Sequence, residues 1–167
     1  QFGGLINFKF KAPNPYKEIE LVSRQSLGSN NLFTSFNSLS GTVGKFSYYT
    51  FYNYKEGESF RPNSQFESHN AFAHLGWQFK PGTNLSVEYT YLDYLAQQPG
   101  GLTDMQFYSD PSFSNRSRNW FEVNWMLYAL KFEHEISERT EFSLNLFGLD
   151  ASRKAVGYRE NRVSQPD

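Results

Sequence analysis

The pattern that decides the fold is clearest in residues 84–91, which read Asn84-Leu85-Ser86-Val87-Glu88-Tyr89-Thr90-Tyr91. Apolar or aromatic side chains occupy the odd positions of this stretch, and polar side chains occupy the even positions. Successive side chains of a β-strand point to opposite faces, so this period of two predicts a strand with one apolar and one polar face.

The same alternation recurs along most of the chain, for example in residues 70–79 and 141–146. It predicts seven antiparallel strands and an all-β fold. Several of these strands exceed the roughly 9–11 residues that cross a bilayer. We expect the strands near residues 15–25, 32–40, 46–56, 67–79, 84–96, 119–136 and 140–155.

The composition favours a transmembrane β-barrel over a soluble sheet. Aromatic residues make up 19% of the 167 residues, yet the mean hydropathy is −0.64. Aliphatic residues are sparse and polar residues fill the alternate positions, as in a barrel whose strands face lipid on one side and a wet lumen on the other. The net charge of −1 gives no electrostatic case for nucleic-acid binding, and the absence of cysteine excludes disulfides and thiolate metal sites.

The connections between the predicted strands alternate in length. Tight turns are expected at 41–45, 80–83 and 137–139, and wider connections at 26–31, 57–66 and 97–118. Outer-membrane barrels show this alternation, with short periplasmic turns and longer extracellular loops. Seven strands that start in the periplasm end outside. We therefore expect residues 156–167 to begin another external loop and further strands to lie elsewhere.

The predicted strand 119–136 does not keep one phase, because its apolar residues change parity near Tyr128 and Ala129. A β-bulge there would restore a single outward face. Alternatively, the upper part of the strand lies above the membrane, where either face can be apolar. The sequence leaves both readings open.

Polar side chains within the strands are expected to line the lumen. The alternation assigns Glu88 and Glu122 to the polar face, and His74 with them. His134 has the outward parity next to a turn, which predicts a place among the lipid headgroups. A periplasmic-side aromatic belt is expected from side chains close to the short turns, namely Trp77, Phe79, Phe132 and Ile136.

Two segments carry a family resemblance. Gly3-Gly4-Leu5-Ile6-Asn7-Phe8 resembles the last plug strand of TonB-dependent outer-membrane receptors, where it leads into the barrel. Leu95-Ala96-Gln97-Gln98-Pro99-Gly100-Gly101-Leu102-Thr103-Asp104, followed by Arg116-Ser117-Arg118-Asn119-Trp120-Phe121, resembles the third extracellular loop and next strand of ferric dicitrate-type receptors.

The resemblance implies that residues 1–12 end a plug domain and that residues 13–167 form the N-terminal part of a 22-stranded barrel. It implies a receptor in the outer membrane of a Gram-negative bacterium that takes up a ferric chelate, either ferric citrate or a related siderophore. The implied partners are TonB, the rest of the plug and barrel, outer-membrane lipid and lipopolysaccharide. No covalently bound cofactor is implied.

The candidate ligand-binding residues lie beside the wide connections. A ferric citrate complex is anionic, and a guanidinium group can donate two parallel hydrogen bonds to a carboxylate. Arg116 and Arg118 have the same parity where the long loop re-enters a strand, Gln97 and Gln98 stand at its other end, and Arg61 lies in the neighbouring loop. The alternative is that such arginines bind lipopolysaccharide phosphates or keep the loop hydrated.

Two other classes of protein share parts of this pattern. A small self-contained outer-membrane barrel fits the length and composition, and a soluble β-sandwich or lipocalin-like binder fits the alternation. No nucleophile–base pair, metal-ligand spacing or cofactor fingerprint is present in the sequence, so we do not expect an enzyme.

Overall fold

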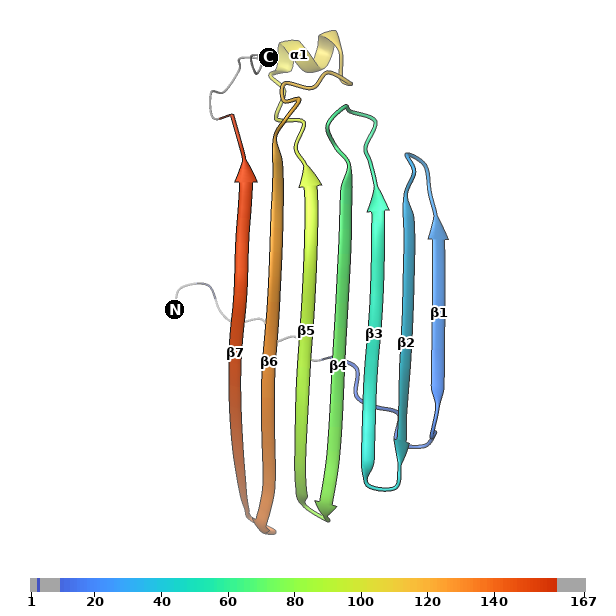
Figure 1. Ribbon diagram of the computed structural model, residues 1–167, viewed down its shortest axis with the longest axis vertical. Helices are drawn as coiled ribbons and strands as arrows, with labels where there is room; N and C mark the ends of the chain where they lie inside the picture. Colours follow the sequence, from blue (N-terminus) through green and yellow to red (C-terminus); the bar gives the residue numbers. More distant parts are fainter. Residues whose placement is uncertain (1–2, 4–9, 159–167) are drawn as a thin grey trace.

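The computed structural model describes residue 3 and residues 10–158. It contains one antiparallel sheet whose strands follow the chain order β1 to β7 (Figure 1). The predicted all-β fold is therefore confirmed. The strands are β1 (Glu20–Leu27), β2 (Phe33–Val43), β3 (Phe46–Gly57), β4 (Phe66–Lys80), β5 (Thr83–Gln97), β6 (Trp120–Ser137) and β7 (Thr140–Val156), and a short helix, α1 (Asp104–Ser109), lies between β5 and β6.

The predicted strand boundaries agree closely with the structure except at the first strand, which begins at Glu20 rather than near residue 15. Pro15 has no backbone N–H to donate to a sheet. The Asn14 side chain accepts a hydrogen bond from the backbone N–H of Tyr16 at 2.9 Å, which forms a local turn instead of a strand.

The register between β5, β6 and β7 is continuous through Tyr128 and Ala129, so of the two readings that the sequence left open, the β-bulge there is wrong. Irregularities occur instead next to two short turns, between Gln78 and Lys80 and between Glu135 and Ser137. Apolar residues therefore change from one face of β6 to the other along its length. The sequence pattern alone allowed a slip, whereas two continuous ladders of hydrogen bonds fix the register.

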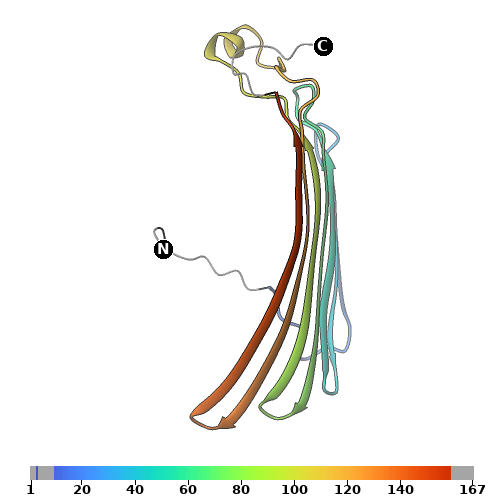
Figure 2. The ribbon, with the colours of Figure 1, turned by 60° about the vertical axis from the view of Figure 1, so that its left-hand side comes forward.

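The sheet is curved, and the segment before β1 lies on its concave side (Figure 2). The ring of Phe10 in this segment stacks on that of Phe72, with centroids 4.0 Å apart. Phe72 therefore marks the concave face. Directly opposed residues of neighbouring strands share a face, so the register assigns every strand residue to the concave or the convex side.

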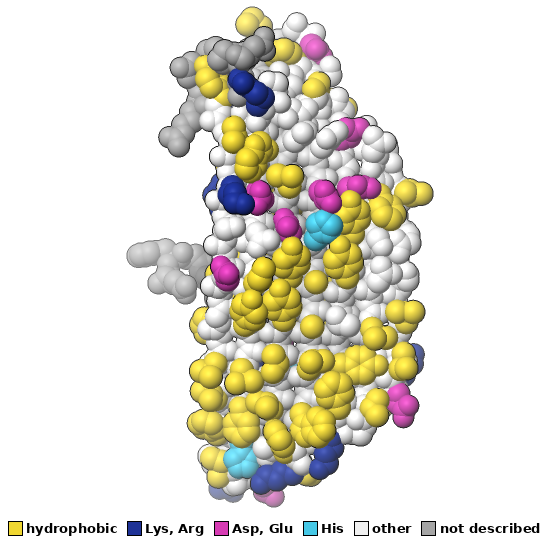
Figure 3. All heavy atoms as spheres, viewed as in Figure 1, with side chains coloured by type: hydrophobic (Ala, Val, Ile, Leu, Met, Phe, Trp, Pro, Cys, Tyr) yellow, Lys and Arg dark blue, Asp and Glu magenta, His cyan; other side chains and the backbone are white. Residues whose placement is uncertain are grey.

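Apolar side chains cover the half of the convex face that lies nearer the short turns. Figure 3 shows this face, with apolar side chains gathered toward that end of the sheet. We call this surface the convex belt. Its larger members are Leu21, Leu39, Val43, Phe46, Tyr48, Leu75, Trp77, Leu85, Val87, Tyr89, Tyr128, Leu130, Phe132, Leu144 and Leu146.

The concave face behind the convex belt is polar. Glu88 lies at its centre, with one carboxylate oxygen 3.1 Å from His74 Nδ1 and the other 2.7 Å from Lys131 Nζ. The predicted polar-face positions of Glu88 and His74 are confirmed. Glu122 is a correction: it opposes Leu95 on the convex side, where it pairs with Lys154 at 3.0 Å. The error followed from local alternation, because the apolar residues Phe121, Val123 and Trp125 made the opposite parity of the upper strand look like the lumen face.

Residues next to the short turns take the expected places. Trp77 and Phe132 lie on the convex face near these turns, as does His134, whose Nδ1 is 2.9 Å from Thr83 Oγ1. Phe79 and Ile136 adjoin the two register irregularities and are about half exposed, at 49% and 61%. Whether these residues form a belt at a membrane surface stays a prediction.

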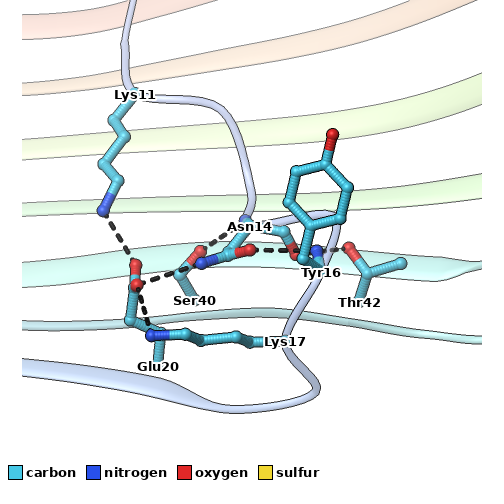
Figure 4. A network of polar contacts seen from close by, with 7 residues as sticks. All are labelled: Lys11, Asn14, Tyr16, Lys17, Glu20, Ser40 and Thr42. Carbon is cyan, nitrogen blue, oxygen red and sulfur yellow. Dashed lines mark hydrogen bonds and ion pairs between the residues drawn. The ribbon is translucent and has the colours of Figure 1, made fainter.

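A polar network fastens the segment before β1 to the sheet (Figure 4). Asn14 donates its backbone N–H to Ser40 Oγ at 2.8 Å and its side-chain amide to Glu20 at 3.0 Å. Lys11 pairs with the same carboxylate at 3.0 Å. The expected plug segment, residues 1–12, lies largely outside the described residues, so its assignment to a plug stays a prediction.

Candidate functional site

The wide connections 28–32, 58–65 and 98–119 all emerge at one end of the sheet, and the short turns lie at the other (Figure 1). The predicted alternation of short and long connections is confirmed. All five candidate residues, Arg61, Gln97, Gln98, Arg116 and Arg118, belong to this end. The structure thus gathers the candidates in one region, although it gives them different roles.

The long connection 98–119 has an ordered polar interior. Thr103 begins α1, and a capping box joins its side chain and backbone to Gln106. Asn115 is only 3% exposed and donates its side-chain amide to the carbonyl oxygen of Gly101. The Thr103–Gln106 spacing is a signature of a helix start that the sequence reading did not use. At the far end of α1, Ser112 donates its hydroxyl and backbone N–H to Asp110, which holds the pKa of that carboxyl below its ordinary value.

Arg61 joins the two longest connections. Its Nε donates to the carbonyl oxygen of Phe113 at 3.0 Å, and Nη2 donates to that of Gly100 at 2.8 Å. Asn63 adds a second link by donating its amide to the carbonyl oxygens of Gln98 and Asn119, at 3.1 and 3.0 Å. The Arg61 guanidinium therefore fastens one loop to the next. Sequence reasoning missed Asn63, which adopts a positive φ of 56° that asparagine tolerates well.

Replacing Arg61 with alanine should loosen the 98–119 connection without unfolding the sheet, because the substitution removes the guanidinium donor from the carbonyls of Phe113, Pro99 and Gly100. We expect faster protease cleavage within 98–119. Limited proteolysis with mass spectrometry measures the rate, and Arg139→Ala, in the turn between β6 and β7, is the control. Equal cleavage rates for Arg61→Ala and the wild type would contradict this role.

Gln97 and Gln98 also form hydrogen bonds that hold the loops and strand ends together. Gln97 Oε1 accepts a hydrogen bond from the backbone N–H of Gln65 at 3.2 Å. Gln98 takes part through its backbone, donating its N–H to the carbonyl oxygen of Asn119 at 2.9 Å. Gln97 also lines a hollow with the carboxylates of Glu56, Glu58 and Glu67, which would repel an anion.

Arg116 and Arg118 do not converge on one hollow. Arg116 is 6% exposed, donates to the carbonyl oxygen of Asn115 at 2.8 Å and lies 5.0 Å from the ring centre of Tyr158. It borders a hollow formed with residues 101–106. Arg118 borders a separate hollow with Trp120 and Glu122. Shared parity predicted a shared side, but loop residues do not alternate as strand residues do.

Charges are segregated between the two faces in the half of the sheet nearer the long loops. The charged side chains on the concave face there are all cationic: Arg24, Lys55 and Arg153. The convex face at the same height carries acidic side chains with Lys154 and His69 among them. Its acidic members are Glu56, Glu67, Asp93, Glu122 and Asp150.

The cationic part of the concave face is also aromatic. We define the concave wall as Leu92, Tyr94, Phe121, Val123, Trp125 and Arg153, which oppose one another across β5, β6 and β7. Tyr94 and Phe121 meet edge to face at 6.2 Å, and the guanidinium carbon of Arg153 lies 4.8 Å from the centre of the Phe121 ring. The sequence contained these residues, but their common face becomes visible only when the register is known.

Within the described part of the chain, no cluster of three or more His, Cys, Asp or Glu side chains is placed to hold a metal ion. No helix among the described residues is long and apolar enough to span a membrane. No family model matches the chain, and no curated protein matches its sequence.

Proposed function

We propose that this chain is part of a TonB-dependent outer-membrane receptor that takes up an anionic ferric chelate. Residues 1–12 would end the plug, and β1 to β7 would be the first strands of a 22-stranded barrel. The observation that carries the proposal is the opposite character of the two faces of one curved sheet: an apolar convex belt, and a concave face that is polar near the short turns and cationic near the long loops.

The convex belt supports the membrane location. Leu75, Val87 and Leu130 oppose one another across β4, β5 and β6, and Leu75 and Val87 are 50% and 48% exposed. The convex belt is a continuous exposed apolar surface that extends across all seven strands, and such a surface needs a non-aqueous partner. In a barrel, that partner is lipid, and a polar inner face with Glu88, His74 and Lys131 would meet the hydrated lumen and the plug.

The long loops and the cationic concave face support the direction and chemistry of uptake. Outer-membrane barrels carry their longer loops outside. Arg24, Lys55 and Arg153 would then line the lumen below the extracellular opening, where they attract anions. The acidic side chains occupy the opposite, outer face. An anionic ligand entering the barrel would therefore meet positive charge on this wall.

The structure divides the candidate residues into those that hold the loops in place and those that could contact the ligand. Arg61 and Arg116 serve the loop framework, so we propose that they position the 98–119 connection above the opening. The side chains of Arg118 and Gln98 remain candidates for contact with the ligand from the rim, whereas Gln97 lies among carboxylates that would repel an anion. Ferric citrate remains the representative ligand of the proposed class, and TonB and lipopolysaccharide remain proposed partners.

Uptake of ⁵⁵Fe-labelled ferric citrate tests the function. We expect cells that express the complete receptor to accumulate the label, and cells that lack it to fail. An uncoupler that collapses the inner-membrane proton gradient should abolish accumulation but leave surface binding intact. The proposal would be contradicted if cells with and without the receptor accumulated equal amounts of ferric citrate and also equal amounts of a ferric catecholate.

A further inference from the structure

We propose that the concave wall is a subsite for aromatic groups, and that the chelate taken up bears anionic aryl ligands such as catecholates. The inference rests on the proposed function and narrows its substrate class. Three features carry it: accessible ring faces, cations without carboxylate partners, and small side chains that leave room beside the rings.

Accessible rings are the first feature. Trp125 is 40% exposed although β6 is paired on both sides. Its neighbours in the register are Leu92 on β5 and Ala151 on β7. In the same way, Phe121 lies between Ala96 and Ala155. Alanine flanks Phe121 on both sides and Trp125 on the β7 side, which leaves space for a flat group to stack against the indole.

The second feature is the positive charge. Arg153 lies over the Phe121 ring, and Lys55 belongs to the same row of opposed residues as Tyr94, Val123 and Arg153. Arg24 lies in the row of Trp125 but on β1, at the opposite edge of the sheet, so Arg153 is the cation of the wall itself. Among the described residues, no carboxylate lies within ion-pair distance of Arg24, Lys55 or Arg153. An anionic ligand would supply the missing negative charge.

The combination of exposed rings and positive charge favours one class of ligand for the concave wall over others. Citrate is anionic but has no ring to cover Trp125 and Phe121. A lipid chain or an apolar peptide would cover the rings but would leave the cations desolvated and unpaired, which is costly. A ferric complex of aryl ligands has both a negative charge and flat faces, so it matches both features of the wall.

The chain itself shows how this face holds an aromatic group. Nearer the middle of the sheet, the Phe10 ring stacks on Phe72 at 4.0 Å. The neighbouring Lys11 lies 5.8 Å from the ring centre of Tyr49 and pairs with Glu20. There, ring and cation both have partners within the described chain. At the concave wall Trp125 is 40% exposed, and Arg153, which lies over the Phe121 ring, has no carboxylate partner among the described residues.

The test compares two chelates on the complete receptor in detergent, using ferric 2,3-dihydroxybenzoate as the aryl probe and ferric citrate as the non-aromatic probe. Calorimetric titration gives both affinities. We expect the wild type to prefer the aryl probe. Trp125→Leu should weaken aryl binding by roughly three- to tenfold, the usual worth of one aromatic contact, and should change citrate binding less than about twofold. Arg153→Gln should weaken both probes.

Matched variants separate the subsite from a folding effect. Trp125→Phe keeps a ring and should retain aryl binding, while Trp77→Leu removes a tryptophan from the convex face and should change neither affinity. If the wild type binds citrate but not the aryl probe, or if Trp125→Leu and Trp125→Phe bind the aryl probe as the wild type does, the subsite is overturned and the receptor function stands. If the wild type binds neither probe, the receptor function fails as well.

Discussion

Replacing Val87 with arginine should destabilise the membrane-inserted receptor by about 2–4 kcal/mol, the cost of a cationic side chain on the lipid face near mid-bilayer. Val87 lies at the centre of the convex belt and is 48% exposed, with Leu75 and Leu130 as its opposed neighbours. The free-energy cost of removing water from the guanidinium is not offset there, because the neighbouring side chains carry no charge. Urea unfolding in lipid vesicles, followed by tryptophan fluorescence, measures the loss.

The matched control for this prediction is Ser86→Arg. Ser86 precedes Val87 on β5 and opposes Gly76 and Lys131, so it lies on the concave face, two residues from Glu88. The same arginine should therefore cost far less there. If both variants lose equal stability, or if Ser86→Arg loses more, the assignment of the convex belt to lipid is wrong.

Replacing Phe72 with alanine should cost about 3–5 kcal/mol, the usual range for truncating a buried phenylalanine. Phe72 is 2% exposed and is the most buried aromatic side chain among the described residues. Its ring stacks on Phe10 at 4.0 Å and contacts the rings of Phe51 at 5.8 Å and Tyr49 at 6.1 Å. The substitution removes the ring on which the segment before β1 rests.

Two measurements distinguish the effects of Phe72→Ala. Urea unfolding reports the global loss, and protease cleavage between residues 10 and 19 reports release of the segment from the concave face. Phe60→Ala, in the 58–65 connection with Phe60 64% exposed, should leave both unchanged. A Phe72→Ala receptor with wild-type stability and wild-type cleavage would show that the segment is not held in this way.

The sheet could be predicted from the sequence because alternation is a local property. Residues 84–91 alternate without interruption, and the strand was found within a residue or two of its ends. β6 was harder, because its apolar residues change parity near Tyr128. A local pattern cannot distinguish a slipped strand from a continuous strand whose faces change character. The pairing with β5 and β7 decides the question, and it is a long-range property.

The loops were less predictable for a related reason. Arg61 and Arg116 have the side-chain chemistry of ligand-binding residues, but both donate to backbone carbonyls: Arg61 to those of a loop distant along the chain, and Arg116 to that of its neighbour Asn115. Composition shows what a side chain can bind and not what lies beside it. The concave wall illustrates the converse. Tyr94, Phe121 and Arg153 are far apart in the sequence, and only the register brings them together.

The most direct test of the central claim, that the convex face meets lipid and the concave face meets water, is cysteine scanning along β5. These 167 residues contain no cysteine, so labelling located within them by peptide mass spectrometry reports only the single substitution made at one of residues 85–90. In the complete receptor in native membranes, we predict that a water-soluble maleimide labels positions 86, 88 and 90 and spares positions 85, 87 and 89. Labelling that ignores parity, or that favours the odd positions, would contradict the account.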